Sequence, residues 1–187
     1  MTNVSEIEFQ WNDFCWEAFI RNTAWSGFQE RKGPYGALSS NKPSLGDVTV
    51  VFAPEGRGDD PLNDKELSLV DWFLTHQQEV ANAILDILFN SYGAIKAGYI
   101  EEFGEEVSET FPGIHSKSDL KKLVGIVSVN IHQVSKDGIP YIGIEMGCDW
   151  EEEHGLGFLL HGGEVVDLGG ADTAILLWKA KQHANKT

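Results

Sequence analysis

Residues 125–150, GIVSVNIHQVSKDGIPYIGIEMGCDW, decide the fold, because their apolar residues recur at every second position. In the first half Val127, Val129 and Ile131 alternate with Ser128, Asn130 and His132, and in the second half Ile142, Ile144, Met146 and Cys148 alternate with Tyr141, Gly143, Glu145 and Gly147. A period of two predicts strands with one buried face. SKDG between them is a turn, with Gly138 at the position that needs a positive φ. The stretch therefore predicts an antiparallel hairpin.

Further strands are expected on both sides of this hairpin. LGFLL and EVVDLGG, joined by the turn HGG, continue it, and a helix over ADTAILLWKAKQ follows. VTVVFA at 48–53 has strong β-propensity and predicts a core strand. Residues 7–12 alternate as a half-buried strand, and 14–20 continue either as a strand or as a short helix. Residues 31–47 are rich in Gly, Pro and Ser and predict a loop.

A long amphipathic helix is predicted after residue 62. Asn63 is the expected N-cap, with Glu66 in the position of a capping box. The apolar stripe has spacings of three and four, interrupted once by Gln77, and consists of Leu67, Val70, Leu74, Ala81, Ile84 and Leu88. We expect this helix to end or kink near Gly93.

The expected fold class is α+β: an antiparallel meander sheet with the long amphipathic helix and the C-terminal helix packed on one face. No internal repeat or linker composition divides the chain. We therefore predict one domain over residues 1–187.

The charge is strongly one-sided, with 29 acidic against 14 basic residues and a net charge of −15. Such a chain repels phosphate backbones and anionic lipid, so we expect no nucleic-acid partner and no membrane binding. It attracts a basic partner, although ordinary solubility explains the same charge. The absence of a signal peptide or long apolar run at the sequence level, and two widely spaced cysteines, predict a cytoplasmic protein. The oligomeric state stays open.

The segment CDWEEEHGLG at 148–157 invites a catalytic or metal-binding interpretation. Glu151-x-x-His154 has the form of a di-iron half-motif, but such a site needs a helix and a second copy. Zinc needs paired Cys or His ligands, which Cys148 and His154 lack nearby. We therefore expect no catalytic residue, metal or cofactor here. We interpret the segment as a structural corner, a tight turn between two strands whose shape is set by its own residues. Its structural residues are Trp150, Glu153, His154, Gly155 and Gly157, together with Asp172 in the tail.

This corner resembles a bacterial family of unknown function whose members carry W-[DE]-x-E-H-G-L-G, followed by a strand, a turn and G-x-A-D. The matching positions here are Trp150, Glu151, Glu153, His154, Gly155, Leu156 and Gly157, and then Gly169, Gly170, Ala171 and Asp172. NTAWSGF near the N-terminus, with Trp25 and Gly27, resembles the family more weakly. The acidic insert at 101–113 has no place in that pattern.

The resemblance implies a function by analogy. Related small acidic α+β proteins are similar to immunity proteins of polymorphic toxin systems, which neutralise toxins by binding them. It implies a non-enzymatic acidic binding protein that masks a basic toxin domain. The expected binding residues are Glu101, Glu102, Glu105, Glu106, Glu151 and Glu152. Two alternatives remain: a hydrolase or metal-dependent enzyme with a pocket near His154, built with Asp149 and His132, and a housekeeping oligomerisation or interaction module.

Overall fold

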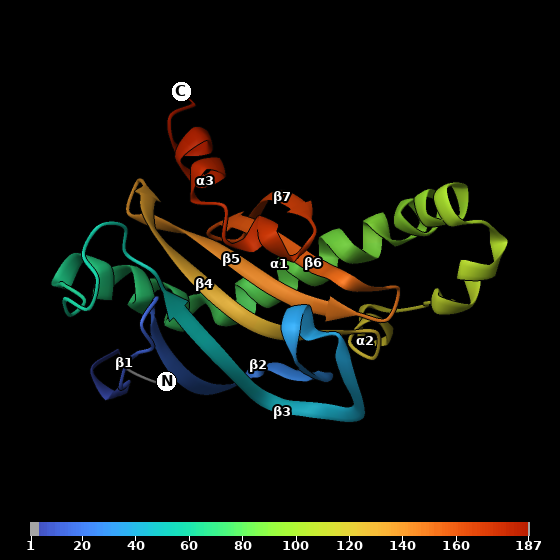
Figure 1. Ribbon diagram of the computed structural model, residues 1–187, viewed down its shortest axis with the longest axis horizontal. Coiled ribbons are helices and arrows are strands. Elements are labelled where there is room, and N and C mark those ends of the chain that lie inside the picture. Colours follow the sequence, from blue (N-terminus) through green and yellow to red (C-terminus); the bar gives the residue numbers. More distant parts are fainter. Residues whose placement is uncertain (1–3, 187) are drawn as a thin grey trace.

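One sheet of seven strands forms the centre of the molecule, which the computed structural model describes for residues 4–186 (Figure 1). The strands are β1 (Gln10–Trp11), β2 (Trp16–Lys32), β3 (Leu38–Phe52), β4 (Val124–Lys136), β5 (Ile139–Cys148), β6 (Glu151–His161) and β7 (Glu164–Gly169). They lie side by side in sequence order, and every neighbouring pair is antiparallel except β3–β4, which is parallel. The predicted meander is thus confirmed for β4–β7 and wrong at the junction of β3 with β4.

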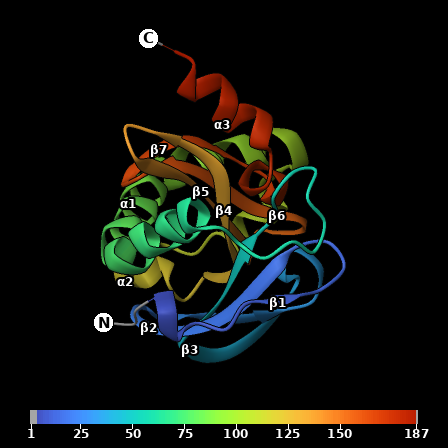
Figure 2. The same cartoon turned by 90° about the vertical axis from the view of Figure 1, so that its left-hand side faces the viewer.

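The parallel junction follows from the helix between the two strands. A chain that leaves one strand and enters a parallel neighbour must first return to the starting end of the sheet, usually through a helix. Here α1 (Asp64–Phe103), a 3₁₀ turn η3 (Glu105–Thr110) and α2 (Lys117–Leu120) form that crossover (Figures 1 and 2). The remaining elements are η1 (Val4–Glu6), η2 (Pro34–Gly36), η4 (Ala171–Ala174) and α3 (Leu177–Ala184).

Helix α1 begins as predicted and ends later than predicted. The Asn63 side chain accepts the Glu66 amide at 3.1 Å, and the Glu66 carboxylate accepts the Asn63 amide at 2.9 Å. The helix then runs through Gly93 to Phe103, so the predicted end near Gly93 is wrong. Its one departure from helical dihedrals lies at His76. Even with 40 residues, α1 lacks the continuous apolar stretch that a membrane span requires, as do the other helices of residues 4–186.

The gap in the apolar stripe of α1 is a buried polar contact. Gln77 is 3% exposed, and its side-chain oxygen accepts the indole N–H of Trp25, which is fully buried on β2, at 2.8 Å. The Gln77 amide nitrogen in turn donates to the Leu74 carbonyl at 3.0 Å. Glutamine at this position therefore satisfies an indole that the core would otherwise leave without a partner.

Gln77→Leu should lower the free energy of unfolding by about 1–3 kcal/mol, because it leaves the buried Trp25 N–H unsatisfied. Gln78→Leu is the matched control, since Gln78 is exposed and should change stability by less than about 0.5 kcal/mol. Urea unfolding followed by tryptophan fluorescence measures both. Equal effects of the two substitutions would contradict the assigned role of Gln77.

The two main helices cover opposite faces of the sheet, not one face as predicted. Ile142 and Ile144 on β5 join the large core that α1 covers. Tyr141, one position away, belongs to a second cluster with Leu159 and with Ala180 of α3. Figure 2 shows α1 and α3 on different sides of the strands. The alternation along β5 does not reveal the second layer, because two of the intervening positions are Gly143 and Gly147, which carry no apolar side chain.

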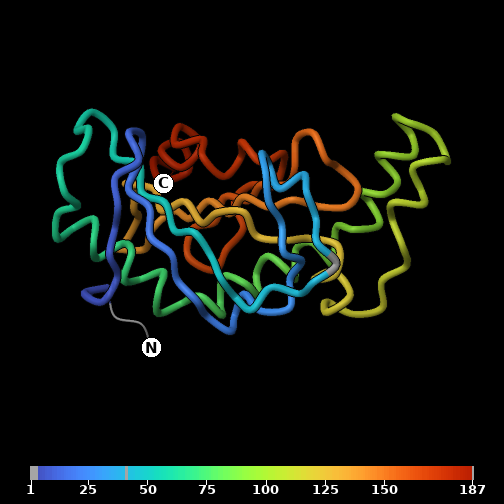
Figure 3. Tube along the Cα trace, turned by 60° about the horizontal axis from the view of Figure 1, so that its bottom comes forward, coloured from blue at the N-terminus to red at the C-terminus, as the bar shows by residue number. Residues whose placement is uncertain are grey.

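The glycine- and proline-rich segment at 31–47 is mostly strand, so its prediction as a loop is wrong. β2 extends to Lys32, and β3 starts at Leu38 and returns antiparallel to it (Figure 3). The register shifts several times between Arg21 and Glu30, and these irregularities accommodate residues that a regular strand disfavours. At the N-terminus only Gln10–Trp11 of the expected 7–12 strand pairs, and 14–20 continues as strand from Trp16.

Candidate functional site

The corner between β5 and β6 is fixed by aromatic packing. Trp150 is 7% exposed and stacks on Phe111 with ring centroids 5.3 Å apart. Tyr92 of α1 meets the same indole edge-on at 5.7 Å, and Tyr99 contacts Phe111 at 5.4 Å. The corner is therefore joined to α1 and to the segment that follows η3. Each such ring contact adds roughly 0.5–1.5 kcal/mol beyond area burial.

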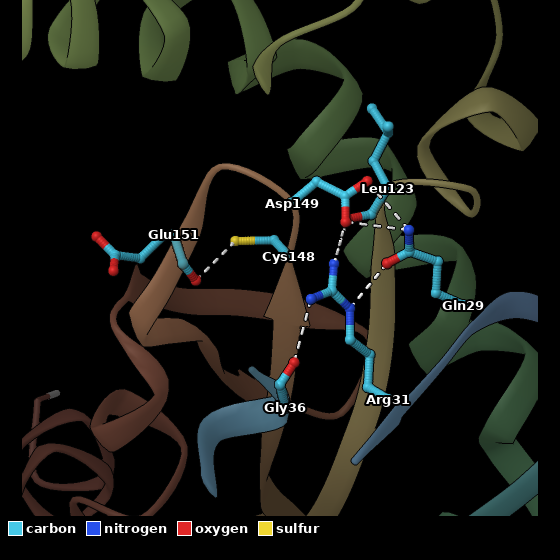
Figure 4. A network of polar contacts seen from close by, with 7 residues as sticks. All are labelled: Gln29, Arg31, Gly36, Leu123, Cys148, Asp149 and Glu151. Carbon is cyan, nitrogen blue, oxygen red and sulfur yellow. Dashed lines mark hydrogen bonds and ion pairs between the residues drawn. The ribbon is translucent and has the colours of Figure 1, made fainter. Parts of the chain in front are cut away.

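On its inner side the corner binds a buried arginine (Figure 4). The Arg31 side chain of β2 is 1% exposed and forms an ion pair with Asp149 at the start of the turn. Its guanidinium also donates to Gln29 Oε1 at 2.8 Å and to the carbonyls of Gly36 at 3.1 Å and Leu123 at 3.4 Å. Gln29 Nε2 donates to both Asp149 oxygens at 3.1 and 3.0 Å. The network ties β2, η2 and the start of β4 to the corner.

Cys148 lies beside this network and has an unreactive environment. It is fully buried, and burial raises the pKa of its thiol to about 12. Only the thiolate is an effective nucleophile or metal ligand. Its sulfur instead contacts the Glu151 carbonyl at 3.7 Å across the turn, so Cys148 packs as a small apolar residue.

On the outer side of the corner, the Glu151 side chain points away from Arg31 (Figure 4). Several donors hold its carboxylate. Tyr99 Oη donates to Oε2 at 3.0 Å, and Oε1 accepts the amides of Glu153 at 2.9 Å and His154 at 3.0 Å. His154 Nδ1 lies 3.4 Å from the same oxygen. Burial by itself raises the pKa of Glu151. The hydrogen bonds together lower it by more, so the pKa lies below its usual range. The lowered pKa favours the ionised form of Glu151, and the hydrogen bonds hold its carboxylate in one orientation.

A cavity of 390 Å³ opens beside this carboxylate. Aromatic and aliphatic side chains of α1, the corner and β7 form its walls, and Gly169 and Gly170 contribute to the lining. The side chains that line it are Ile95, Tyr99, Trp150, Glu151, His154, Leu156 and Leu168. The cavity therefore combines apolar walls with one anchored negative charge.

Two positions of the corner require glycine because backbone carbonyl groups of other segments lie close to them. Gly155 has φ 60°, a conformation that favours glycine, and a Cβ there would lie 2.9 Å from the carbonyl oxygens of Met146 and Tyr35. A Cβ on Gly157 would lie 2.3 Å from the Gly170 carbonyl oxygen. Asp172 is exposed in η4 and the His154 side chain is 74% exposed. The tail thus packs its backbone against the glycines of the corner.

The predicted acidic binding residues come from two segments that the structure brings together. Glu101 and Glu102 lie in the last turn of α1, and Glu105 and Glu106 lie in η3. All four are exposed, as is Glu152 on β6. The Tyr99–Glu151 hydrogen bond joins the end of α1 to the corner. Burial raises the pKa of Tyr99 most, Glu151 raises it next, and the charge of Glu102 adds a small effect in the same direction.

The insert at 101–113 is fastened at both ends. Its first residues form the last turn of α1, and near its other end Phe111, 1% exposed, packs against Trp150. Tyr92 Oη donates to the Pro112 carbonyl at 2.9 Å, and Lys96 Nζ donates to the Phe111 carbonyl at 3.1 Å. Figures 1 and 3 show the end of α1 and the insert projecting beyond the sheet. The acidic residues are therefore displayed on a packed projection.

The alternative catalytic grouping of His154, Asp149 and His132 is not assembled. Asp149 is committed to Arg31, and His132 is 7% exposed with Nε2 3.0 Å from the Ala174 carbonyl oxygen. Burial lowers the pKa of His132. The Asp149 amide bonds Leu123 at one end of β4, whereas His132 lies nine residues further along, a span of roughly 30 Å in strand geometry.

The fold and the corner define an α+β domain with a crossover helix and a sheet covered on both faces. The chain belongs to the family described as "Domain of unknown function (DUF6985)", whose model matches residues 19–176. The match covers β3 to η4 and most of β2, and it ends immediately before α3. No curated protein and no solved structure shows significant similarity to the chain. The family of unknown function expected from the sequence is thus confirmed, whereas the corner motif and the likeness to immunity proteins stay predictions.

Proposed function

We propose that the chain is an acidic binding protein that recognises a basic protein partner through the projection at the end of α1. We call this surface the acidic end and define it as Glu101, Glu102, Phe103, Glu105, Glu106 and Glu152. A single observation carries the proposal: none of its carboxylates has a cationic partner within ion-pair distance in the described residues 4–186.

Some surface carboxylates elsewhere in the molecule are paired, whereas others, such as Asp59, Asp60 and Glu164, have no ion pair among residues 4–186. Asp47 binds Arg21 at 2.7 Å, Glu55 binds Lys181 at 2.7 Å, and Asp167 binds Lys179 at 2.5 Å. Like charges held close together cost free energy, and a cationic partner would recover that cost. The acidic end is distinguished by density: four of its five unpaired carboxylates lie within residues 101–106, and this concentration supports it as the surface for a basic partner.

Phe103 supplies the apolar component that a binding surface needs. Its side chain is 52% exposed among the carboxylates and contacts Tyr99 with ring centroids 5.8 Å apart. Interface energy concentrates in a few aromatic or arginine anchors, while surrounding charges mainly set association rate and specificity. The acidic end would then use Phe103 for affinity and its glutamates for attraction.

The finer form of the proposal is an immunity protein that masks a basic toxin domain. It rests on the resemblance of the corner to a family similar to immunity proteins and on the net charge of −15. Opposite charge accelerates encounter with a basic domain and makes the association depend on salt.

The test uses basic toxin domains encoded next to the gene, with association rates measured at 50 and 500 mM NaCl. Replacing Glu101, Glu102, Glu105 and Glu106 with lysine should slow association at low salt by about tenfold or more. The matched control reverses Glu8, Asp59, Asp60 and Glu164, which are exposed elsewhere; both variants carry a net charge of −7. Equal slowing in the two variants, or a rate independent of salt, would contradict the proposal.

A further inference from the structure

The cavity beside Glu151 has the chemistry of a receptor for one long cationic side chain. Its walls are mostly apolar, with Ile95, Leu156 and Leu168 beside the rings of Tyr99 and Trp150. An arginine side chain is complementary to such a cavity. Its apolar stem packs on apolar walls, and its planar guanidinium stacks on aromatic rings and binds carboxylates. A volume of 390 Å³ exceeds what a single such side chain requires.

The carboxylate in the cavity retains an open acceptor position. A carboxylate has about four lone-pair positions. Oε1 of Glu151 accepts two backbone amides, whereas Oε2 accepts only the Tyr99 hydroxyl among residues 4–186. The Glu151 side chain is 18% exposed and lines the cavity. A donor that enters the cavity therefore meets an ionised, oriented oxygen in a partly dehydrated setting, where charge-assisted hydrogen bonds are strong.

We propose that this cavity binds an arginine side chain of the basic partner, with the guanidinium on Glu151 and the stem against Trp150 and Tyr99. The inference rests on the proposed function, because it takes the partner to be a basic protein. It assigns distinct roles to two neighbouring surfaces: the acidic end attracts the partner, and the cavity anchors it. The His154 side chain also lines the cavity, and its Nδ1 lies 3.4 Å from Oε1, so Oε2 is the oxygen that the guanidinium would approach.

The probe is N-acetyl-arginine methylamide, titrated into the full chain and followed by amide and indole NMR shifts. We expect saturable shifts at the Trp150 indole and at the amides of Gly155 and Gly169. The citrulline analogue has nearly the same shape without the charge, and it should bind about tenfold or more weakly. Equal binding of citrulline, or shifts confined to other parts of the chain, would overturn the assignment.

Two variants test the site itself. Glu151→Gln keeps an oxygen for the amides of Glu153 and His154 but removes the charge, and it should weaken the arginine probe about tenfold or more. Glu164→Gln makes the same charge change on an exposed residue of β7 that neither lines the cavity nor belongs to the acidic end, and it should leave the probe unaffected. Leu168→Trp fills the cavity while keeping the carboxylate and should also abolish binding. Unchanged binding in Glu151→Gln would refute the proposal.

The two proposals fail in distinguishable ways. If the arginine probe binds at Glu151 but no basic toxin domain binds the chain, the proposed function is wrong and the cavity assignment stands. If a toxin domain binds with the expected salt dependence and Glu151→Gln leaves its dissociation rate unchanged, the cavity assignment is wrong and the acidic end remains the binding surface.

Discussion

Asp149→Leu should lower the free energy of unfolding by about 3–5 kcal/mol, because it leaves the buried Arg31 guanidinium without its counter-charge. The remaining partners of Arg31 are neutral: Gln29 Oε1 and the carbonyls of Gly36 and Leu123. They satisfy donors but do not offset the cost of a cation that is 1% exposed. Urea unfolding monitored by circular dichroism measures the loss.

Two comparisons make this prediction specific. Asp47→Leu breaks the ion pair between Arg21 and Asp47, whose side chains are 64% and 59% exposed. Because solvent screens this pair, its loss should lower stability far less than Asp149→Leu does. The double replacement of Arg31 by Met and Asp149 by Leu removes both charges and should recover part of the stability lost in Asp149→Leu alone. A loss at Asp149 no larger than at Asp47 would show that the network does not hold the corner.

Gly143→Ala should destabilise the chain by about 1–3 kcal/mol or more, through overpacking. A Cβ on Gly143 would lie 1.7 Å from the Ala174 carbonyl oxygen and 2.5 Å from its carbon, so the backbone of η4 must move. The displacement should also release α3, which follows η4 directly. Hydrogen exchange over residues 177–184 should therefore accelerate in the variant, beyond the change in global stability.

Gly93→Ala and Gly98→Ala are controls that should raise the free energy of unfolding, whereas Gly143→Ala should lower it. Nothing lies within 4 Å of a Cβ at either position, and both residues are in the interior of α1. Alanine should stabilise the helix there by about 0.5–1 kcal/mol per site. Exchange over α3 unchanged in Gly143→Ala would contradict the close contact between β5 and η4.

The local elements were predictable where a local pattern specifies them. The capping box at Asn63 and the strands β4 and β5 depend on residues close in sequence, and the structure confirms both. The predicted alternation fails at Val127, because a bulge between Ile126 and Ser128 places Ile126 on the main core instead. The turn at 137–138 follows the same rule, with positive φ at Asp137 and Gly138. The parallel pairing of β3 with β4 was missed because it depends on where the crossover returns the chain, which no local pattern records.

The candidate site was predictable only in part. The sequence located the corner, but it could not pair Asp149 with Arg31, which lies 118 residues away inside a segment that resembled a loop. Nor could it join the two acidic segments, because Tyr99 and Glu151 are 52 residues apart. A usable signal was present in the glycines of β5: Gly143 and Gly147 alternate on one face and mark close backbone packing on a second buried side.

Hydrogen-exchange mapping of a complex with a basic toxin domain tests the central claim most directly. The account predicts slower exchange over residues 99–106 and 150–155, which contain the acidic end and the cavity, and unchanged exchange over β1 and the first half of β2. Protection confined to β1–β3 or to α3, or no complex with any basic domain at low salt, would contradict it.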